Sequence, residues 1–442
     1  MKNLLILHLE STTWQRLAAF SSAFPNTRRL MSQSLVFDNF FSSATSTLMV
    51  VTYLFYGNDF EFDTASVFEG MRPAANNPHL FSSLRGRGYA TELVCLNGFH
   101  AVRPTKLSAW ADDLPPVWGT NDFPTLFARF DELTDTTPFA IYVWNLITHI
   151  EHSLALAPFS SGLTDQVRRA CGVADHAIGE LLATLERKGL LDNTTIVVYG
   201  DHGDDYWTHG DKGGMVHGTE PYSQITWTPL AIRDAQLGAA TDGRLASTIG
   251  IAPTLRALLG VDEKTTFPHS GIDLLARANT RVFSQNFTAN QPDDRTVGIR
   301  KAFSVADDAC NLLASSRGLE LYAYRLDPGN HCNLLHFFEL APDGRLTLRS
   351  RPNAAGHFRA AFQDNPGAVA DLATRFTTLR AALAERIEAK RAYIVAQDAK
   401  PAYALDPRCL ATVADDPRAE PRAAPPGTRP STPLFDVSFK LR

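Results

Sequence analysis

The segment NTTIVVYGDHGDDYW, residues 193–207, decides the fold class, because an apolar run ends abruptly in charged residues. Residues 196–199 have the pattern of a strand that is buried on both faces of a parallel sheet. The run leads directly into Gly-Asp-His-Gly, so the Asp201 carboxylate and the His202 imidazole follow the strand's carboxyl end. In open α/β sheets, ligands bind at that end of the strands. The segment therefore predicts a parallel sheet with a site at its edge.

Strands and helices alternate along the rest of this region. Apolar runs at 3–10 and 138–147 predict two further buried strands, and residues 79–96 predict a short helix followed by a strand. Residues 164–189 have apolar side chains at helical spacing and end in a glycine. This alternation over about 260 residues predicts a doubly wound α/β domain, with a mostly parallel sheet and helices on both of its faces.

Ligand-type side chains follow three of the predicted strands. Glu10, His149 and the Asp201-His202 pair each come just after a strand's carboxyl end, so they are expected at one edge of the sheet. Carboxylates and neutral imidazoles suit a divalent ion such as zinc or manganese. The glycines beside the pair are expected to let the backbone turn sharply and approach the ion. The alternative is that Asp201 caps a helix and His202 is a loop residue, but the convergence favours a metal centre.

Composition excludes several other classes of protein. The chain has 442 residues, 44% of them hydrophobic and 20% charged, which predicts a soluble globular protein with a large core plus one smaller unit. The net charge of −5 is spread along the chain without a basic stripe, so no nucleic-acid partner is expected. No apolar run is long enough for a transmembrane helix. The N-terminus lacks the apolar core of a signal peptide, which predicts a cytoplasmic protein, or one peripheral to the inner membrane face.

Composition also suggests four units. The α/β catalytic domain is expected to occupy residues 1–280, and short alternating runs with turn signals predict a small antiparallel β subdomain at 281–350. Residues 351–399 contain an amphipathic helix at 367–397, which either covers the core or pairs with another subunit in a homo-oligomer. Residues 400–442 are rich in proline and alanine and are expected to form a linker or an extended tail.

Several segments resemble metal-dependent enzymes of the alkaline phosphatase superfamily. ERKGLLDNTTIVVYGDHGD, residues 186–204, resembles the segment that closes the sheet in sulfatases, lipoteichoic acid synthases and phosphoethanolamine transferases. GIAPTLRALLGV at 250–261 and WTPLAI at 227–232 resemble a helix and a strand of the same enzymes. GLELYAYRLDPGNHCNLLH at 318–336 resembles the hairpin of the sulfatase C-terminal subdomain. The resemblance runs in order over residues 3–340 and implies an alkaline-phosphatase/sulfatase-like fold.

The resemblance also implies a nucleophile. Sulfatases carry Cys-x-Pro-Ser-Arg between the first strand and the next helix, and its Cys or Ser is converted to formylglycine. Counted back from Gly57, the equivalent position is Thr47, and neither the proline nor the arginine is present. The sequence ATST instead resembles the Thr-x-Thr of phosphoethanolamine transferases, whose second threonine is phosphorylated. Thr47 is therefore the expected nucleophile, with Thr45 and Ser46 next; these hydroxyls also suit the role of helix caps.

Carried over position by position, the resemblance implies four metal ligands, Glu10, Thr47, Asp201 and His202. One tightly bound divalent ion is expected, zinc or manganese, with magnesium and calcium as the alternatives.

Four further residues are expected to contact the substrate. His149 and His217 match histidines that face the phosphoryl group, and His217 is also a candidate acid for the leaving group. Lys212 is close to His217 in the sequence and is expected to assist. Asn145 occupies the place of an aspartate that holds a second metal in related phosphodiesterases. This replacement supports a single ion.

The resemblance implies a phosphoryl-group transferase of the phosphoethanolamine or phosphoglycerol type, acting through a phosphothreonine intermediate. Its donor would be a small-molecule or lipid phosphodiester, and its acceptor a glycan or lipid of the cell envelope. The alternatives are a soluble phosphodiesterase, phosphonate monoester hydrolase or sulfatase-like hydrolase, and, in another class, a non-catalytic binder of a phosphorylated glycan or lipid. The complete set of nucleophile and metal ligands favours an enzyme.

Overall fold

The larger sheet has eight strands in the order β5-β4-β6-β1-β7-β8-β2-β9. All run parallel except β8, which pairs antiparallel with β7 and β2, so the predicted mostly parallel sheet is confirmed. The computed structural model describes residues 1–59, 78–96, 117–120, 122–149, 162–206, 208–209, 217–262, 269–286, 300–342, 344–348, 366–396, 405 and 407–414. The strands are β1 (Asn3–Leu9), β2 (Leu35–Phe37), β4 (Ala90–Leu96), β5 (Val117–Thr120), β6 (Phe139–Asn145), β7 (Thr194–Gly200), β8 (Leu230–Arg233) and β9 (Ala240–Asp242).

The central strands are apolar throughout because helices cover both faces of the sheet. Every residue of β1, β6 and β7 is buried. Along β1, Leu4 and Ile6 pack into the core under α3 and α10, whereas Leu5 and Leu7 pack into the core under α2 and α8. The helices are α1 (Trp14–Ala19), α2 (Pro25–Met31), α3 (Thr47–Tyr56), α4 (Leu80–Arg85), α6 (Phe123–Asp131), α8 (Leu163–Arg187), α9 (Ser223–Thr226) and α10 (Ile251–Leu258).

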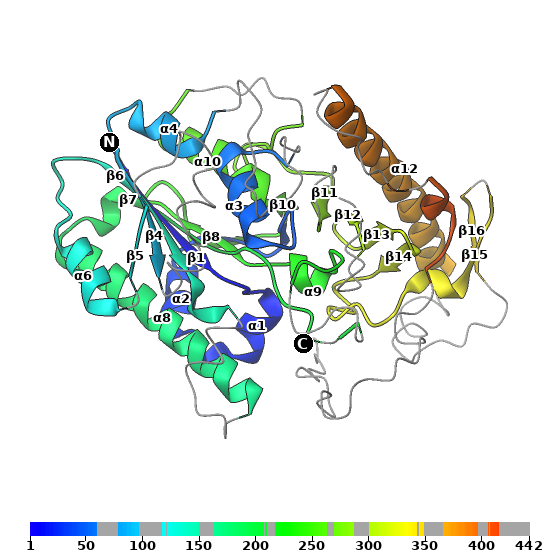
Figure 1. The fold of residues 1–442 in the computed structure, drawn as a ribbon, viewed down its shortest axis with the longest axis horizontal. Coiled ribbons are helices and arrows are strands. Elements are labelled where there is room, and N and C mark those ends of the chain that lie inside the picture. Colours follow the sequence, from blue (N-terminus) through cyan, green and yellow to red (C-terminus); the bar gives the residue numbers. More distant parts are fainter. Residues whose placement is uncertain are drawn as a thin grey trace.

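A second, antiparallel sheet lies beside the first, as the alternating runs after residue 281 predicted (Figure 1). One face of the long helix α12 covers it through Leu372, Phe376 and Leu383. Covering the core was one of the two roles expected for this helix; pairing with another subunit stays a prediction. The elements are β11 (Val282–Gln285), β12 (Ala302–Ala306), β13 (Asn311–Ser315), β14 (Gly318–Tyr322), a hairpin of β15 (Phe338–Leu340) and β16 (Leu346–Leu348), and α12 (Pro366–Ala396).

Short elements complete the described chain. A two-stranded pairing joins β3 (Phe40–Phe41) to β10 (Ala246–Ser247) beside the start of α3. No helix in the described ranges, α12 included, is long and apolar enough to cross a membrane. The 3₁₀ turns are η1 (Ser21–Ala23), η4 (Leu146–Thr148), η5 (Leu191–Asn193), η7 (Thr248–Gly250), η8 (Leu334–Phe337) and η10 (Pro407–Ala411).

A buried histidine makes the fold sensitive to acid. His79 precedes α4, its Nδ1 accepts a hydrogen bond from Phe81 N at 3.1 Å, and its ring packs against Phe55 and Tyr56. Burial, assisted by nearby arginines, lowers the pKa of His79 from 6.5 to about 3. The unfolded chain therefore binds a proton in a pH range where the folded chain does not. It follows that this histidine destabilises the fold progressively as the pH falls from 6.5 towards 3.

We expect His79→Asn, which keeps a short side-chain acceptor for the helix, to weaken this acid sensitivity. Between pH 7 and about pH 4.5, the wild type should lose about 2–3 kcal/mol more unfolding free energy than the variant. Urea unfolding of both proteins at the two pH values measures this difference. Parallel losses in the two proteins would show that His79 is not the titrating group.

Candidate active site

Two neighbouring strands deliver acidic side chains to the same edge of the sheet. Strands β1 and β7 pair in parallel with Leu9 opposite Gly200, so Glu10 and Asp201 leave the sheet side by side. Both carboxylates and the adjacent His202 are completely buried. Their convergence follows from the parallel register.

Thr47 is the first residue of α3, and its hydroxyl completes this cluster. Thr47 Oγ1 donates to Glu10 Oε1 at 2.9 Å and lies 2.9 Å from His202 Nε2. His202 Nε2 lies 3.1 Å from Asp201 Oδ2 and 3.6 Å from Glu10 Oε1. The structure thus brings together the four residues that the sequence suggested as metal ligands.

The backbone between the strand end and α1 is shaped to hold Asp201. Ser11 adopts a φ of 50°, a left-handed conformation that is costly for a residue other than glycine. In this conformation Ser11 N donates to Asp201 Oδ1 at 2.8 Å. With Oδ1 held by the backbone, Oδ2 is the oxygen that faces His202.

The two glycines beside this pair make room for neighbouring chain. A Cβ on Gly200 would lie 1.8 Å from Thr12 O, and a Cβ on Gly203 would lie 2.5 Å from Thr13 Cγ2 and 2.7 Å from Gln224 O. Neither glycine is among the described residues with a positive φ. These glycines therefore do not use the left-handed backbone that glycine favours, and the close approach of Thr12, Thr13 and Gln224 leaves no room for a side chain at either position.

Among the described residues, no lysine or arginine forms an ion pair with the buried Glu10 and Asp201 carboxylates. In the described part of the chain, the groups that form ion pairs with Glu10 and Asp201 are the histidines His8 and His202. Burial raises the pKa of Glu10, and the Asp201 carboxylate adds to this effect. Burial also acts to raise the pKa of Asp201, but His202 and His8 hold it below its ordinary value. Burial lowers the pKa of His202, which favours the neutral imidazole. Buried negative charge of this kind calls for a cation.

The donor atoms also have spacings that suit a divalent ion. Ligands at 2.0–2.2 Å from a tetrahedral ion are about 3.3–3.6 Å apart. The separations among Glu10 Oε1, Thr47 Oγ1 and His202 Nε2, and between His202 Nε2 and Asp201 Oδ2, run from 2.9 to 3.6 Å. Asp201 Oδ2 is buried without a hydrogen-bond partner. The residues present therefore fit a divalent metal.

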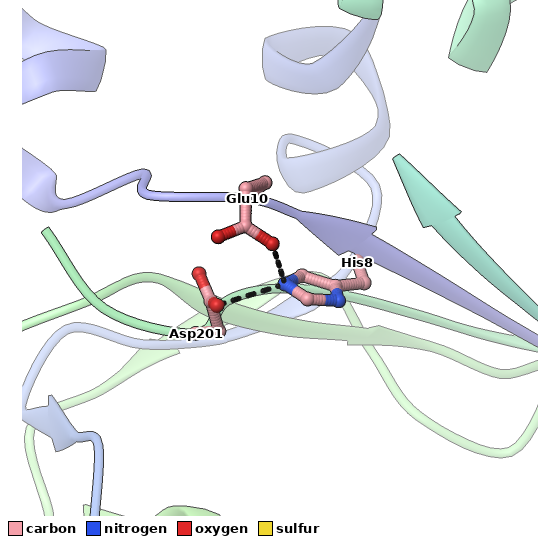
Figure 2. A group of neighbouring side chains, drawn as sticks. All are labelled: His8, Glu10 and Asp201. Carbon is pink, nitrogen blue, oxygen red and sulfur yellow. Dashed lines mark ion pairs between the residues drawn. The ribbon is translucent and has the colours of Figure 1, made fainter. Parts of the chain in front are cut away.

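His8 was missed in the sequence, although it lies against both carboxylates. His8, Glu10 and Asp201 form a group of buried side chains that could hold a metal ion (Figure 2). The sequence contained a feature that could have revealed His8. This histidine interrupts an apolar strand two residues before Glu10, and residues at that spacing lie on the same face of a strand.

His217 is held beside the cluster by a second acid that the sequence analysis did not select. Its Nδ1–H donates to Asp204 Oδ1 at 3.1 Å, and Arg16 Nη2 donates to Asp204 Oδ2 at 3.0 Å. The ring of His217 lies 4.2 Å from that of His202 and 5.2 Å from that of His149, between ring centroids. Burial acts to lower the pKa of His217, but the hydrogen bond to Asp204 raises it above its ordinary value. The protonated form is therefore favoured.

The remaining predicted residues are placed differently. The Asn145 amide accepts from Ile147 N and donates to Ala174 O, each at 3.3 Å, so the side chain braces the turn after β6 and does not join the cluster. Lys212 lies outside the described residues. Thr45 Oγ1 donates to Thr219 O at 3.2 Å, which leaves Thr47 as the threonine of this segment that faces the carboxylates.

Comparisons with known proteins agree with this architecture. Residues 2–261 match the family model described as Sulfatase. The chain is 29% identical over 129 residues to lipoteichoic acid synthase 2 of Bacillus subtilis, an alignment that covers 28% of this chain and only 20% of that relative. The chain thus spans about a fifth of the length of the curated relative it matches.

Two solved structures show the same fold at low sequence identity. A 2-O glycosaminoglycan sulfatase superposes with a TM-score of 0.59 at 14% identity, covering 94% of this chain and 97% of that one. The lipoteichoic acid synthase LtaP from Listeria monocytogenes superposes with a TM-score of 0.50 at 15% identity, covering 70% and 81%. The chain has an alkaline-phosphatase-like fold, and because the family match takes in more than half of the 442 residues, it belongs to the sulfatase family.

Proposed function

We propose that this sulfatase-family enzyme is a metal-dependent phosphoryl-group transferase with Thr47 as its nucleophile. The observation that carries the proposal is the Thr47 hydroxyl, 2.9 Å from both Glu10 Oε1 and His202 Nε2 at the start of α3. A formylglycine requires an aldehyde on Cβ, and the Cβ of threonine already carries a methyl group. Thr47 is therefore unsuited to the sulfatase maturation and suited to direct attack on phosphorus.

Four side chains would hold the divalent ion: Glu10, Thr47, Asp201 and His202. When bound, the ion lowers the pKa of the threonine hydroxyl and offsets negative charge on the phosphoryl group. One imidazole donor and three oxygen donors make zinc or manganese the best candidates.

The protons and bonds balance with this chain's own residues. Thr47 Oγ1 forms a bond to phosphorus as its proton leaves toward Glu10 Oε1, the acceptor that it already faces. The bond from phosphorus to the donor's oxygen breaks, and protonated His217 supplies a proton to that oxygen. In the second half, neutral His217 takes the proton of an acceptor hydroxyl, whose oxygen attacks phosphorus. The bond from phosphorus to Thr47 Oγ1 breaks, and Glu10 returns its proton to that oxygen. Asp204 keeps His217 oriented through both halves.

The proposed donor is a phosphodiester of the phosphoethanolamine or phosphoglycerol type, and the proposed acceptor is a hydroxyl of a glycan or lipid. The sequence likeness to a lipoteichoic acid synthase supports this choice. The second candidate is a hydrolase, in which water attacks the phosphothreonine and releases the phosphoryl group. The similarity of the fold to that of a sulfatase is the reason to test this alternative.

The discriminating experiment is intact-mass analysis after incubation with phosphodiester donors and with an aryl sulfate. We expect a phosphoryl adduct on Thr47 with a phosphodiester donor, faster turnover of phosphodiesters than of sulfate esters, and no converted residue in peptides covering 42–47. Release of the adduct by an added alcohol marks a transferase, and release by water alone marks a hydrolase. A formylglycine in this segment, or a strong preference for sulfate esters, would overturn the proposal.

His217→Ala should be slow rather than inactive. Loss of a general acid-base group costs roughly 10²–10⁴-fold in kcat, and the loss should be largest with donors whose leaving group has a high pKa. Asp204→Asn should show the same dependence more weakly, because it removes the charge that holds the His217 proton. If the loss instead appears in KM and does not depend on the leaving group, His217 only contacts the phosphoryl group.

A further inference from the structure

His8 occupies an unusual position for a histidine, in the middle of a strand that is otherwise apolar. Its side chain is completely buried, and its ring stacks between Trp144 and Tyr199, with ring centroids 5.7 and 5.1 Å away. An imidazole costs more to bury than a leucine unless both of its nitrogens are used. In the structure, Nδ1 has a hydrogen-bond partner, whereas Nε2 has none.

The ring is oriented by a pair of buried tyrosines. His8 Nδ1 shares a hydrogen bond with Tyr142 Oη at 2.8 Å, and Tyr142 Oη shares another with Tyr199 Oη at 2.7 Å. Histidines that bind metals commonly have their second ring nitrogen held in this way, which sets the tautomer and aims the other nitrogen. Here the aimed nitrogen is Nε2.

Nε2 points at the carboxylates from the side opposite to its tyrosine partner. It lies 3.2 Å from Asp201 Oδ2 and 3.6 Å from Glu10 Oε2 (Figure 2). Yet His8 Nε2 and Asp201 Oδ2 are both buried without a hydrogen-bond partner. The separation of 3.2 Å between these atoms also matches two ligands on one ion, because ligands at 2.0–2.2 Å are about 2.8–3.8 Å apart at the angles of a five-coordinate ion.

We propose that His8 is a fifth protein ligand of the divalent ion, bound through Nε2 with its Nδ1–H donated to Tyr142. The donor atoms of His8, Glu10 and Asp201 lie within 4.8 Å of one another, in a group that could hold a metal ion. The site then presents two imidazoles, from His8 and His202, in place of one. A second imidazole shifts the preference of the site towards zinc and away from manganese, magnesium and calcium, which favour oxygen ligands.

This inference rests on the metal centre of the proposed function, and the test separates the two. The full-length protein is loaded with zinc, and X-ray absorption at the zinc edge counts the bound imidazoles. We expect two imidazoles in the wild type and one in His8→Gln. The control His79→Asn, which also removes a buried histidine, should keep two.

Zinc affinity, measured by competition with a chelator, gives a second readout. Loss of an outer partner of a metal ligand costs about 10- to 100-fold in affinity, so His8→Gln should lose more than this. The variant should also discriminate less between zinc and manganese than the wild type does.

One imidazole in the zinc-loaded wild type would overturn the inference and would leave His8 as a hydrogen-bond partner of Asp201. An affinity loss of 100-fold or less, with an unchanged absorption spectrum, would overturn it in the same way. Both outcomes leave the proposed function intact.

A wild type that binds no zinc or manganese would refute the metal centre itself. Two imidazoles without any adduct on Thr47 would support His8 as a ligand and contradict only the proposed reaction.

Discussion

Thr47→Ala should lower phosphodiester turnover by about 10⁴-fold or more, because it deletes the atom that attacks phosphorus. The other proposed metal ligands, His8, Glu10, Asp201 and His202, are unchanged, so the variant should still bind metal and donor. The measurements are kcat, KM and metal content per chain. Thr47→Ser retains a hydroxyl on the same Cβ and should recover a large part of the lost rate.

A matched control lies on the same helix. Thr52 Oγ1 donates to Leu48 O at 2.6 Å and faces neither carboxylate, so Thr52→Ala should keep its turnover. If Thr47→Ala turned over at the wild-type rate, the nucleophile would be elsewhere. Thr45 and Ser46 would then be tested first.

Asp201→Asn should abolish both metal content and turnover. The substitution keeps the size of the side chain and an oxygen for Ser11 N, but it removes a buried negative charge that no neighbouring group replaces. Metal per chain after dialysis, measured by elemental analysis, should fall to background. Turnover should fall with it, because the threonine hydroxyl loses its activation.

Asp175→Asn provides the control for removal of a buried aspartate. Asp175 is buried in α8, and its carboxylate accepts hydrogen bonds from Asn26 N and Thr27 N in α2. This variant is expected to lose stability but to bind metal in full. Full metal occupancy in Asp201→Asn would refute the ligand assignment.

The sequence by itself determined the sheet and much of its edge. Apolar runs showed which strands are buried on both faces, and parallel strands place their carboxyl ends together, so Glu10 and Asp201 could be expected side by side. A count back from Gly57, which ends α3 with a φ of 68°, selected Thr47 correctly as the hydroxyl that faces these carboxylates. The strand ends could be predicted because apolar runs are local features of a chain, whereas Thr47 was selected through the resemblance to a known family.

Only the tertiary structure decided which atoms meet. Ser11 N and Asp201 Oδ1 are 190 residues apart in sequence and 2.8 Å apart in space, and the two unpartnered atoms of the His8–Asp201 pair face each other across two strands. The Asn145 amide forms hydrogen bonds with the backbone of Ile147 and Ala174, and Asp204, which the sequence did not single out, holds His217. Periodicity reports which face of a strand is buried, but the direction of a polar side chain depends on partners that the fold brings from distant segments.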